Sequence, residues 1–542
     1  MDWTPLFPLT ALEPGHLKAH HGVLVVRTAD GALHAMENAC PHQGYPLAQG
    51  TLSGGTLTCC WHNFKFDVTS GACVMGEEAV RTHPVRVVDG VVEVRRHVEV
   101  DVAAAWTSLA QAMARVQTGR IARDVARLLS AGVPPARLLA WGAAWDADRG
   151  EYGPSHTAAL AGTLLGWLDA PVAGTDARAH PVQLVTEALD LAARAVVGLP
   201  LRVRPAAEAP GADAAAELRR RVEAEDAPGA EALVRGMVAA GWTRPALEAA
   251  LYPLVADHFL DFGHMLIYVA KTLDLAEAAD AADAGSASPA TADALLGGLV
   301  YGIACGTRED TLPPWAGFRA RWKAFAAADG PALAFAARNA APLPPADRAA
   351  LRAALADGTA AEAFTAAAAA LTRGAWDDVL DALVLAGATR LARFDLAHDA
   401  DPTVEEGWLD VTHRLTVASA VREAVSRWAD PEVTRIVLAA VHFVAIARPL
   451  DGPAATLPPA PDAAELRAIA LRDRSGRAIF FAHDVKTLAV AEAESARLGD
   501  PLPLQAVARF FAAPVRERPV QRLAHEAVRL VHDGKPPRTL SG

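Results

Sequence analysis

The spacing of hydrophobic residues changes once along the chain, near residue 100. Before this point, short segments of alternating or β-branched character predict β-strands. These segments are residues 22–27, 33–37, 56–61, 64–68, 85–88 and 91–94. Turn sequences separate them at Asp30-Gly31, Gly54-Gly55 and Asp89-Gly90, where glycine favours a reversal of the chain. The N-terminal region is therefore expected to be all-β and to close with a hairpin.

After about residue 101 the apolar residues recur at the spacing of an α-helix, with Pro or Gly at the breaks. We predict a multidomain α and β protein, with an all-β domain at residues 1–98 and a large all-α domain at residues 99–542. An apolar segment from Leu295 (LLGGLVYGIACG) corresponds to one from Val437 (VLAAVHFVAIAR), and a His-bearing segment precedes each. This correspondence predicts an internal repeat of a helical hairpin.

Composition limits the classes of partner. With 542 residues, of which 52% are hydrophobic, the chain can bury sizeable cores. The formal net charge of −12 and the absence of a run of Lys and Arg disfavour nucleic acid as a partner. The N-terminal sequence lacks a basic segment followed by an apolar core, and the longest apolar stretch, residues 436–447, is short and contains a histidine. We expect a soluble cytoplasmic protein that does not span a membrane.

Two cysteine-histidine segments form the most specific chemical pattern. The sequence CPH at residues 40–42 is followed, after sixteen residues, by CCWH at residues 59–62. Cys40 and Cys59 can supply two thiolates to one iron, and His42 and His62 can supply two imidazoles to another, which is the ligation of a Rieske 2Fe-2S cluster. A zinc site is disfavoured, because the neighbouring glycines and aromatic residues do not follow a zinc ribbon or finger pattern.

Residues 1–97 resemble the Rieske family beyond these ligands. The residues that carry the resemblance are Gly44, Leu47, Trp61, Asn63, Phe64, Phe66, Asp67 and Gly71. High-potential members have a disulfide between the two loops and hydroxyl groups that donate to the cluster sulfurs. In this chain Tyr45 and Trp61 take the disulfide positions, and Phe64 and Phe66 stand where the hydroxyls would lie. The resemblance therefore implies a lower-potential cluster of the kind found in oxygenases and their ferredoxins.

The three remaining cysteines do not suggest a disulfide framework, because four of the five cysteines lie in the cluster region. We expect Cys60 to pack as a small apolar residue and not to act as a ligand. Cys73 and Cys305 are expected to be buried free thiols.

Histidines inside apolar helices are the notable feature of the second domain. They are His156, His258, His264, His413, His442 and His483. Asp257, Asp261 and His264 stand at positions i, i+4 and i+7, and Glu406, Asp410 and His413 repeat these offsets. Each triplet would share one face of a helix, and facing stripes of carboxylates and histidines hold non-haem iron in helical bundles.

We predict a second site formed by Asp261, His264, Asp410, His413 and His442, as iron ligands or as acid and base groups, with His156, His258 and His483 as further candidates. The alternative for each histidine is a structural one, because a single histidine on an apolar helix face is usually a hydrogen-bonded core residue.

The helical region also resembles the questin oxidase-like family over most of residues 105–540. The matching segments are ARLLAWGAAW with His156 downstream, GHMLIYVAKTLDL, THRLTVASAV, AVHFVAIAR, AHDVKTLAVAEAE and GKPPRTL. Members of that family include oxygenases that open the ring of anthraquinone-type polyketides by Baeyer-Villiger chemistry. The fusion to an iron-sulfur domain departs from the plain members of the family.

Together these features predict an oxidoreductase, a monooxygenase of Baeyer-Villiger or hydroxylating type that oxidises an organic substrate, aromatic or polyketide-like, with O2. Electrons would come from an external flavin reductase or ferredoxin, because the chain has no convincing nucleotide-binding glycine motif. They would leave the cluster through His42 or His62. Two alternatives stay open at this point: an electron-transfer protein whose helical domain is a partner-binding scaffold, and a redox sensor with a non-oxidative helical domain. The sequence also leaves open whether the chain forms a homo-oligomer.

Overall fold

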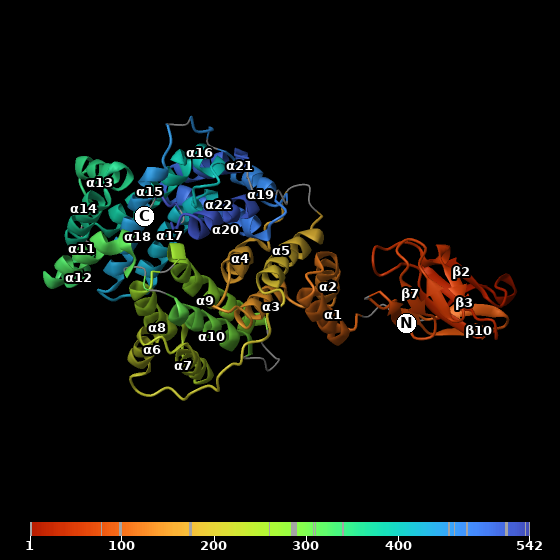
Figure 1. The fold of residues 1–542 in the computed structure, drawn as a ribbon. Coiled ribbons are helices and arrows are strands. Elements are labelled where there is room, and N and C mark those ends of the chain that lie inside the picture. Colours follow the sequence, from red (N-terminus) through yellow and green to blue (C-terminus); the bar gives the residue numbers. More distant parts are fainter. Residues whose placement is uncertain are drawn as a thin grey trace. The chain divides into compact units, whose positions relative to one another are not determined.

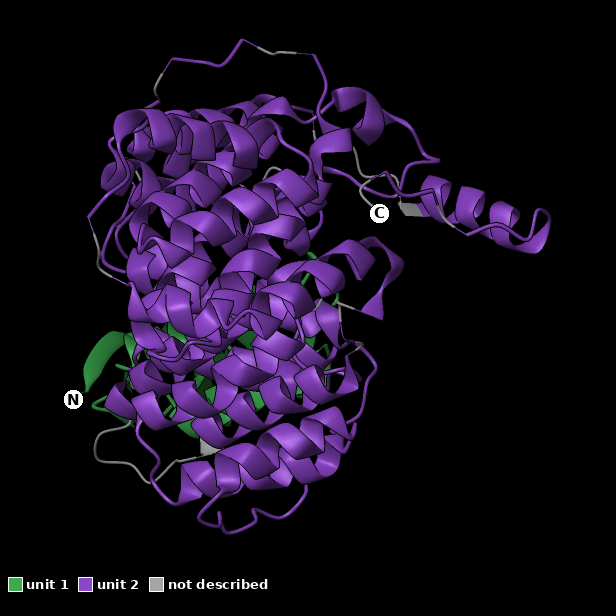
Figure 2. Cartoon of the chain, turned by 90° about the vertical axis from the view of Figure 1, so that its left-hand side faces the viewer, with its two compact units in different colours: residues 1–112, 126–132 green, residues 113–125, 133–542 purple. Residues whose placement is uncertain are grey.

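The computed structural model describes most of the chain, in two compact units. The residues outside the description are 1–2, 77, 97–99, 173–175, 260, 283–289, 307, 309–310, 339–340, 454–455, 460, 473–474, 515–518, 537 and 541–542, together with the side chains of Asp261, Ala290 and Pro519. The first unit contains residues 1–112 and 126–132, and the second contains residues 113–125 and 133–542 (Figure 2). Each unit is described by itself.

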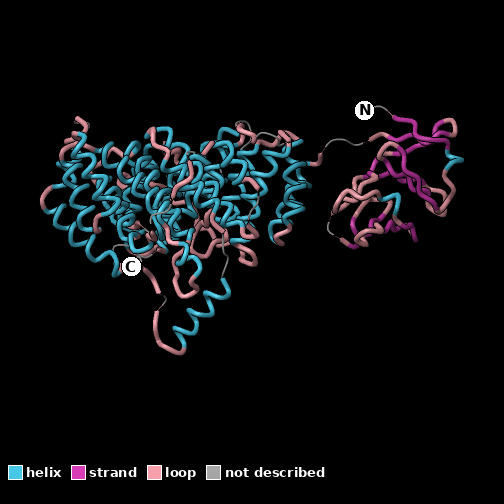
Figure 3. Tube along the Cα trace, turned by 90° about the horizontal axis from the view of Figure 1, so that it is seen from above, coloured by secondary structure: helices cyan, strands magenta, loops and turns pink. Residues whose placement is uncertain are grey.

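The named β-strands all lie in the N-terminal unit (Figure 3). They are β1 (Thr4–Pro8), β2 (His16–His20), β3 (Val23–Arg27), β4 (Leu33–Glu37), β5 (Thr51–Ser53), β6 (Thr56–Thr58), β7 (Lys65–Asp67), β8 (Cys73–Met75), β9 (Thr82–His83), β10 (Val85–Val88) and β11 (Val91–Val94). They form three antiparallel sheets with the orders β1-β11-β10, β2-β3-β4-β9 and β5-β6-β7-β8.

The predicted strands agree with the observed ones where the local pattern is strong. The bounds of β4, β10 and β11 match the prediction, and Asp89 and Gly90 join the last two strands with φ values of 48° and 76°. Two left-handed residues in succession are what a type I′ hairpin turn requires. The predicted strands at 56–61 and 64–68 are shorter in the structure, because the residues between β6 and β7 form a loop.

Two apolar cores hold the strands of this unit together. One joins β1 and β11 to one face of β3 and β4 through residues such as Val25 and Val92. The other contains Phe66 together with Cys40 and Cys59, which are 2% and 1% exposed. The alternation of side chains across β3 explains how one strand serves both cores, since Leu24 and Val26 face the second core while Val25 faces the first.

The second region is helical, as predicted, and the fold class is confirmed (Figure 1). Its helices begin with α1 (Val102–Ala114), α2 (Thr118–Ser130), α3 (Pro135–Ala147), α4 (Thr157–Leu164), η3 (Leu165–Trp167), α5 (Ala179–Ala195), α6 (Ala214–Glu223), α7 (Ala227–Ala239), α8 (Arg244–Asp257), η4 (Asp261–Gly263), α9 (His264–Ala282) and α10 (Ala290–Cys305). They continue with α11 (Ala316–Ala327), α12 (Gly330–Ala336), α13 (Pro345–Asp357), α14 (Ala360–Thr372), α15 (Trp376–Arg393), α16 (Leu396–Ala400), α17 (Trp408–Arg427), α18 (Val433–Ile446), α19 (Ala463–Ala470), α20 (Ala478–Leu498), α21 (Leu502–Ala512) and α22 (Pro519–Val531).

Four of these helices form a closed ring. The helix α4 packs on α9, α9 on α17, α17 on α20, and α20 on α4 (Figure 1). The two predicted hairpins are present, since α9 packs on α10 and α17 packs on α18. The chain from Val433 to Leu450 is long and apolar enough to cross a membrane, but 78% of it is buried inside the fold, as expected for a core helix.

Candidate metal centres

Two loops of the N-terminal unit present the predicted cluster ligands in the same backbone conformation. In the first loop the N–H of Cys40 donates to the carbonyl of Tyr45, and the N–H of Gly44 donates back to the carbonyl of Cys40. The second loop repeats these bonds at the same offsets. The N–H of Cys59 donates to the carbonyl of Phe64, and the N–H of Asn63 donates to the carbonyl of Cys59. Gly44 and Asn63 are both left-handed, with φ values of 78° and 61°. Both loops therefore turn back sharply just after the histidine.

The ligand atoms fit a cluster with one buried end and one exposed end. Burial, together with the neighbouring Cys59, raises the pKa of the Cys40 thiol to about 11. Two adjacent buried thiolates are stable only beside positive charge, which the irons of a 2Fe-2S cluster would supply. The rings of His42 and His62 lie 4.6 Å apart at 90°, with His42 half-buried and His62 exposed. The imidazole side is thus the open side.

Aromatic rings take the places around these loops that the sequence suggested. Phe64 stacks on His42 at 4.8 Å, and Tyr45 stacks on Trp61 at 4.2 Å. The expectation that the other cysteines are buried is wrong. Cys60 begins the turn after β6 and Cys305 is the last residue of α10, and both are exposed, while Cys73 is only half-buried.

Four histidines from the ring of four helices converge in the second unit. The Nε2 atoms of His264 and His413 are 2.7 Å apart, and those of His413 and His483 are 3.2 Å apart. The ring of His156 lies 4.5 Å from that of His264 and 4.8 Å from that of His483. His156, His413 and His483 each place a ring nitrogen within 4.8 Å of the others. We call these four residues the histidine cluster.

Direct hydrogen bonds do not satisfy every ring nitrogen of the histidine cluster. Two imidazole nitrogens bound at about 2.1 Å to one metal lie roughly 3.0–3.4 Å apart, a range that includes the 3.2 Å pair and slightly exceeds the 2.7 Å pair. A neutral imidazole has one N–H, yet the Nε2 of His413 faces two other Nε2 atoms. The buried Nε2 of His156 has no hydrogen-bond partner among the described residues. A cation at the centre would satisfy all of these lone pairs.

The protonation of the cluster also suits metal binding. The Nδ1–H of His483 donates to the carbonyl of Ile479 at 2.8 Å, which leaves its Nε2 as a lone-pair donor. Burial holds the pKa of His156, His413 and His483 well below the ordinary value, and the nearby Lys486 and the other histidines lower it further. Neutral imidazoles are the form that binds a metal.

These lowered pKa values predict how the stability of the metal-free protein depends on pH. His413 is neutral in the fold and becomes protonated below about pH 6.5 once unfolded, so acid favours the unfolded chain. Each such histidine should cost about 1.4 kcal/mol of unfolding free energy per pH unit below 6.5. Urea unfolding at pH 7.5 and 5.5 should therefore show a smaller acid-induced loss for His413→Gln than for the wild type. An equal loss in both proteins would contradict the buried, neutral state of His413.

A cavity of about 930 Å³ opens along the same four helices. Its walls include Gly162 and Thr163 of α4, Lys271 of α9, Ser419 of α17 and Val490 of α20. Each of these residues comes six or seven positions after the cluster histidine of its helix. The four helices therefore run in the same direction from the histidine cluster to the cavity, which lies roughly 10 Å further along.

Lys486 lies between the histidine cluster and the cavity. It follows His483 by three residues on α20, lines the cavity, and is 4% exposed. Burial lowers the pKa of its ammonium group to about 7. Its amine has no hydrogen-bond partner among the described residues. Lys486 is thus able to hold or release a proton near neutral pH at the inner end of the cavity.

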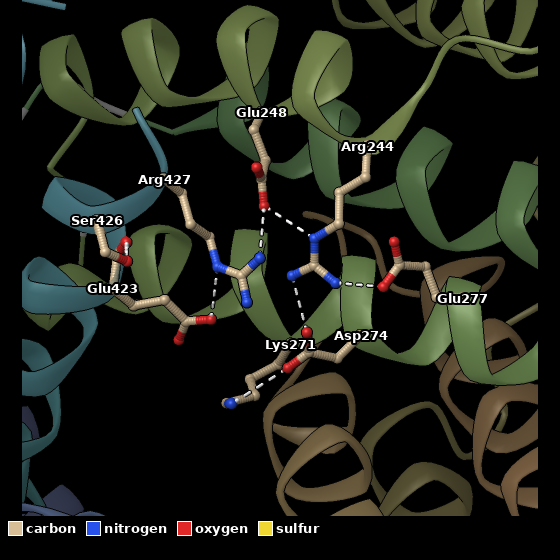
Figure 4. Close-up of polar contacts among 8 residues, drawn as sticks. All are labelled: Arg244, Glu248, Lys271, Asp274, Glu277, Glu423, Ser426 and Arg427. Atoms are coloured by element: carbon tan, nitrogen blue, oxygen red, sulfur yellow. Dashed lines mark hydrogen bonds and ion pairs between the residues drawn. The ribbon is translucent and has the colours of Figure 1, made fainter. Parts of the chain in front are cut away.

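An ion-pair network fixes the charged wall of the cavity (Figure 4). Arg244 donates to Glu248, Asp274 and Glu277 at 2.9, 2.8 and 2.6 Å. Arg427 donates to Glu423 and pairs with Glu248. Asp274 and Glu423 line the cavity, and each is held by an arginine from outside it.

On another wall, Arg467 makes two hydrogen bonds to Glu492. The cavity wall therefore carries paired charges beside the apolar surface of Trp167 and Val490.

The described carboxylates of the predicted stripes, those of Asp257, Glu406 and Asp410, contact other partners than the histidine cluster. The expectation that Asp257, Asp261 and His264 share one helix face is wrong, because α8 ends at Asp257 and Phe262 is left-handed with φ 63°. Asp257 instead pairs with Arg219 at 2.7 Å. The side chain of Asp261 is outside the described residues.

The second stripe fails in a similar way. Glu406 precedes α17 and accepts a hydrogen bond from the N–H of Leu540. Asp410 is the third residue of α17 and its side chain accepts the N–H of the cap residue Gly407, and burial raises its pKa to about 6.

Two of the predicted histidines contact other residues. His258 bonds to Glu223 at 2.8 Å, at the end of α8. The prediction that His442 joins His264 and His413 is wrong, because His442 contacts Trp315, Phe318 and the carbonyl of Pro314. Burial lowers its pKa to about 4. It lies on α18, which packs on α14, α15 and α17.

Sequence reasoning missed three residues around the histidine cluster. Tyr268 stacks on His264 at 5.4 Å, Phe262 stacks on His413 at 5.3 Å, and Lys486 faces the cavity. A lysine three positions after a histidine in an otherwise apolar helix was a usable signal for the last of these. The positions of the two aromatic residues depend on packing between helices and left no such signal.

Comparison with known proteins identifies relatives of the N-terminal unit. The sequence profile of the Rieske [2Fe-2S] domain matches residues 2–89. The chain is 34% identical over 98 residues to the anthranilate 1,2-dioxygenase ferredoxin subunit of Burkholderia cepacia, covering 17% of this chain and 91% of that one. It is 36% identical over 75 residues to the 4beta-methylsterol monooxygenase of Methylococcus capsulatus, covering 12% of this chain and 20% of that one.

A solved structure gives a similar coverage. The ferredoxin of carbazole 1,9a-dioxygenase from Nocardioides aromaticivorans is 27% identical, with a TM-score of 0.17, over 18% of this chain and 100% of that one. The chain thus spans nearly all of two ferredoxins and a fifth of the sterol monooxygenase. The two sequence relatives named above are, by their names, a monooxygenase and a dioxygenase ferredoxin subunit.

Proposed function

Because this chain belongs to the Rieske [2Fe-2S] family through its N-terminal domain, we propose that the whole chain is an oxygenase with a second, non-haem iron in its helical unit. The ligands of that iron are His156, His264, His413 and His483. The observation that carries the proposal is the convergence of three Nε2 atoms at 2.7 and 3.2 Å. Imidazole is a good ligand for iron as well as for zinc and copper, and the fusion to an electron carrier favours a metal that changes its oxidation state.

The two metal sites would divide the chemistry between them: the cluster supplies single electrons, and an iron at the histidine cluster supplies a place for O2 to bind and be reduced. His62, which is exposed, offers the path by which electrons leave the N-terminal unit. An external flavin reductase or ferredoxin of the cytoplasm would reduce the 2Fe-2S cluster again after each electron has left. A monooxygenase reaction inserts one oxygen atom into the substrate and releases the other as water, which takes two electrons and two protons. Lys486 is placed to deliver a proton at the inner end of the cavity.

The cavity is the proposed substrate site. Trp167 and Val490 offer apolar surface for an organic molecule, and the paired charges of Lys271 and Asp274 can orient polar groups. The resemblance of the helical region to the questin oxidase-like family supports an aromatic or polyketide-like substrate and a Baeyer-Villiger or hydroxylating reaction. The side chains of the wall would keep water from the histidine cluster once the cavity is filled.

The test is the rate at which O2 reoxidises the reduced cluster. The protein is reduced without oxygen, mixed with O2, and followed by the visible absorption of the cluster. Reoxidation should be at least about tenfold slower in His413→Gln than in the wild type, because the variant keeps the cluster and loses the site where O2 is reduced. The variant His442→Gln serves as the matched control and should keep the wild-type rate.

Equal rates in all three proteins would refute the proposal. They would favour instead an electron-transfer or redox-sensing protein whose helical unit is a scaffold.

A further inference from the structure

Lys486 is an exception among the charged residues that line the cavity. The other charged lining residues that the structure describes form ion pairs with each other or with a neighbouring arginine. These pairs are Lys271–Asp274, Glu423–Arg427 and Glu492–Arg467, at 3.3, 3.2 and 2.6 Å. The Nζ of Lys486 has no hydrogen-bond partner among the described residues, although the side chain is only 4% exposed.

This arrangement is unfavourable in the ligand-free protein. Burial removes water from the amine of Lys486, and the described part of the wall supplies no carbonyl or carboxylate in its place. Burial therefore disfavours the charged form and lowers the pKa of Lys486 to about 7. Buried lysines are rare in proteins unless they are paired. An unpaired one beside a cavity indicates that its partner arrives with a ligand.

The ligand that satisfies Lys486 carries one negative charge on an apolar body. A carboxylate is ionised at neutral pH and accepts a charge-assisted hydrogen bond from an ammonium group. A phenol, with an ordinary pKa of about 10, would bring no charge. A phosphate would bring a second charge, but Lys271 and Arg467 on the cavity wall are already paired. Trp167 and Val490 supply apolar surface, and the indole favours an aromatic ring as the body of the ligand.

We propose that the cavity binds aromatic carboxylic acids and that Lys486 selects them by pairing with the carboxylate. This inference rests on the proposed function, because it takes the cavity as the substrate site, and it adds the class of substrate. The carboxylate would lie at the inner end of the cavity, and the ring would lie against the apolar wall. The carbon atoms next to the carboxyl group would then be nearest to the histidine cluster.

Calorimetric titration of the full chain, as purified and oxidised, with 2-naphthoate and 2-naphthamide tests the charge preference. The two probes have the same ring and nearly the same shape, but only the first is charged. The wild type should bind 2-naphthoate about tenfold to a hundredfold more tightly, which is the effect of one hydrogen bond between charged groups. Lys486→Met should bind both probes equally. Lys271→Met is the matched control on the same wall and should keep the preference, because Lys271 is already paired with Asp274.

The variant His413→Gln separates the effect of Lys486 from that of the proposed iron, since iron also binds carboxylates. It removes the central histidine of the cluster and keeps Lys486, so it should still prefer 2-naphthoate. A preference that is lost in His413→Gln but kept in Lys486→Met would overturn the proposal. The titration requires neither O2 nor turnover, so its result does not depend on the outcome of the reoxidation test.

The stability of Lys486→Met tests whether Lys486 has a partner inside the protein. Without ligand, this variant should unfold at a higher urea concentration than the wild type, because an apolar side chain replaces an unpaired amine. Unfolding at a lower concentration would overturn the proposal, and so would a wild type that binds both probes equally or binds neither at millimolar concentration. Tighter binding of 2-naphthol than of 2-naphthoate would overturn the carboxylate as the recognised group.

Discussion

Replacing His413 by alanine should lower the iron content from about three atoms per chain to about two, while the 2Fe-2S cluster stays intact. His413 has the central position of the histidine cluster, since its Nε2 lies within 3.2 Å of the Nε2 atoms of both His264 and His483. Loss of a metal ligand should weaken binding by more than the roughly 10–100-fold effect of losing a residue that only orients a ligand. Elemental analysis of the protein, loaded with ferrous iron and desalted, measures the change.

The matched control for this experiment is His442→Ala. Both residues are buried imidazoles, 3% and 2% exposed, on the consecutive helices α17 and α18. Both substitutions leave a cavity and cost a similar part of the stability. Only His413 belongs to the histidine cluster, so His442→Ala should keep about three irons. Full iron content in His413→Ala would show that the histidine cluster does not bind iron. A wild type with only the two irons of the 2Fe-2S centre would show the same.

Two adjacent cysteines should behave in opposite ways in the N-terminal unit. Cys59→Ser should abolish the visible absorption and the low-temperature paramagnetic signal of the reduced cluster, because the Cys59 thiol is buried beside Cys40 in the ligand loop. Cys60→Ser should keep both signals, because the Cys60 side chain is exposed. The two variants make the same replacement of sulfur by oxygen, at neighbouring positions of the chain. Iron bound by the histidine cluster should persist in both.

His62→Ala extends this comparison to the imidazole side. Its ring lies beside that of His42 and is exposed, so its removal should leave the loop folded and the cluster lost. A cluster that survives in His62→Ala, or one that disappears in Cys60→Ser, would exclude the ligand assignment.

The sequence predicted the N-terminal unit well because the signals there are local. The turn at Asp89-Gly90 needs two left-handed residues, and the strands on both sides follow from its geometry. Each ligand loop is also complete within six residues, from Cys40 to Tyr45 and from Cys59 to Phe64. Loops of this kind fix the ligand types and spacing without help from distant parts of the chain.

The histidine cluster was only partly predictable, because its members are far apart in the sequence. His264 and His413 are separated by 149 residues, and His413 and His483 by 70. Their positions in apolar helical segments are visible in the sequence, but six histidines had equivalent local patterns. The packing of α4, α9, α17 and α20 into a ring selected four of them, and the position of α18 on another side of α17 separated His442.

The carboxylate stripes show where a periodic pattern misleads. Asp257 and His264 have helical spacing, but α8 ends at Asp257, and the left-handed residues Phe262 and Gly263 separate it from α9. The sequence by itself determined the two regions, their secondary structure and the cluster loops, since these depend on contacts between residues close along the chain. Only the tertiary structure decided which histidines meet and where the cavity lies, because those contacts depend on which helix faces pack together, and the local sequence pattern does not specify that choice.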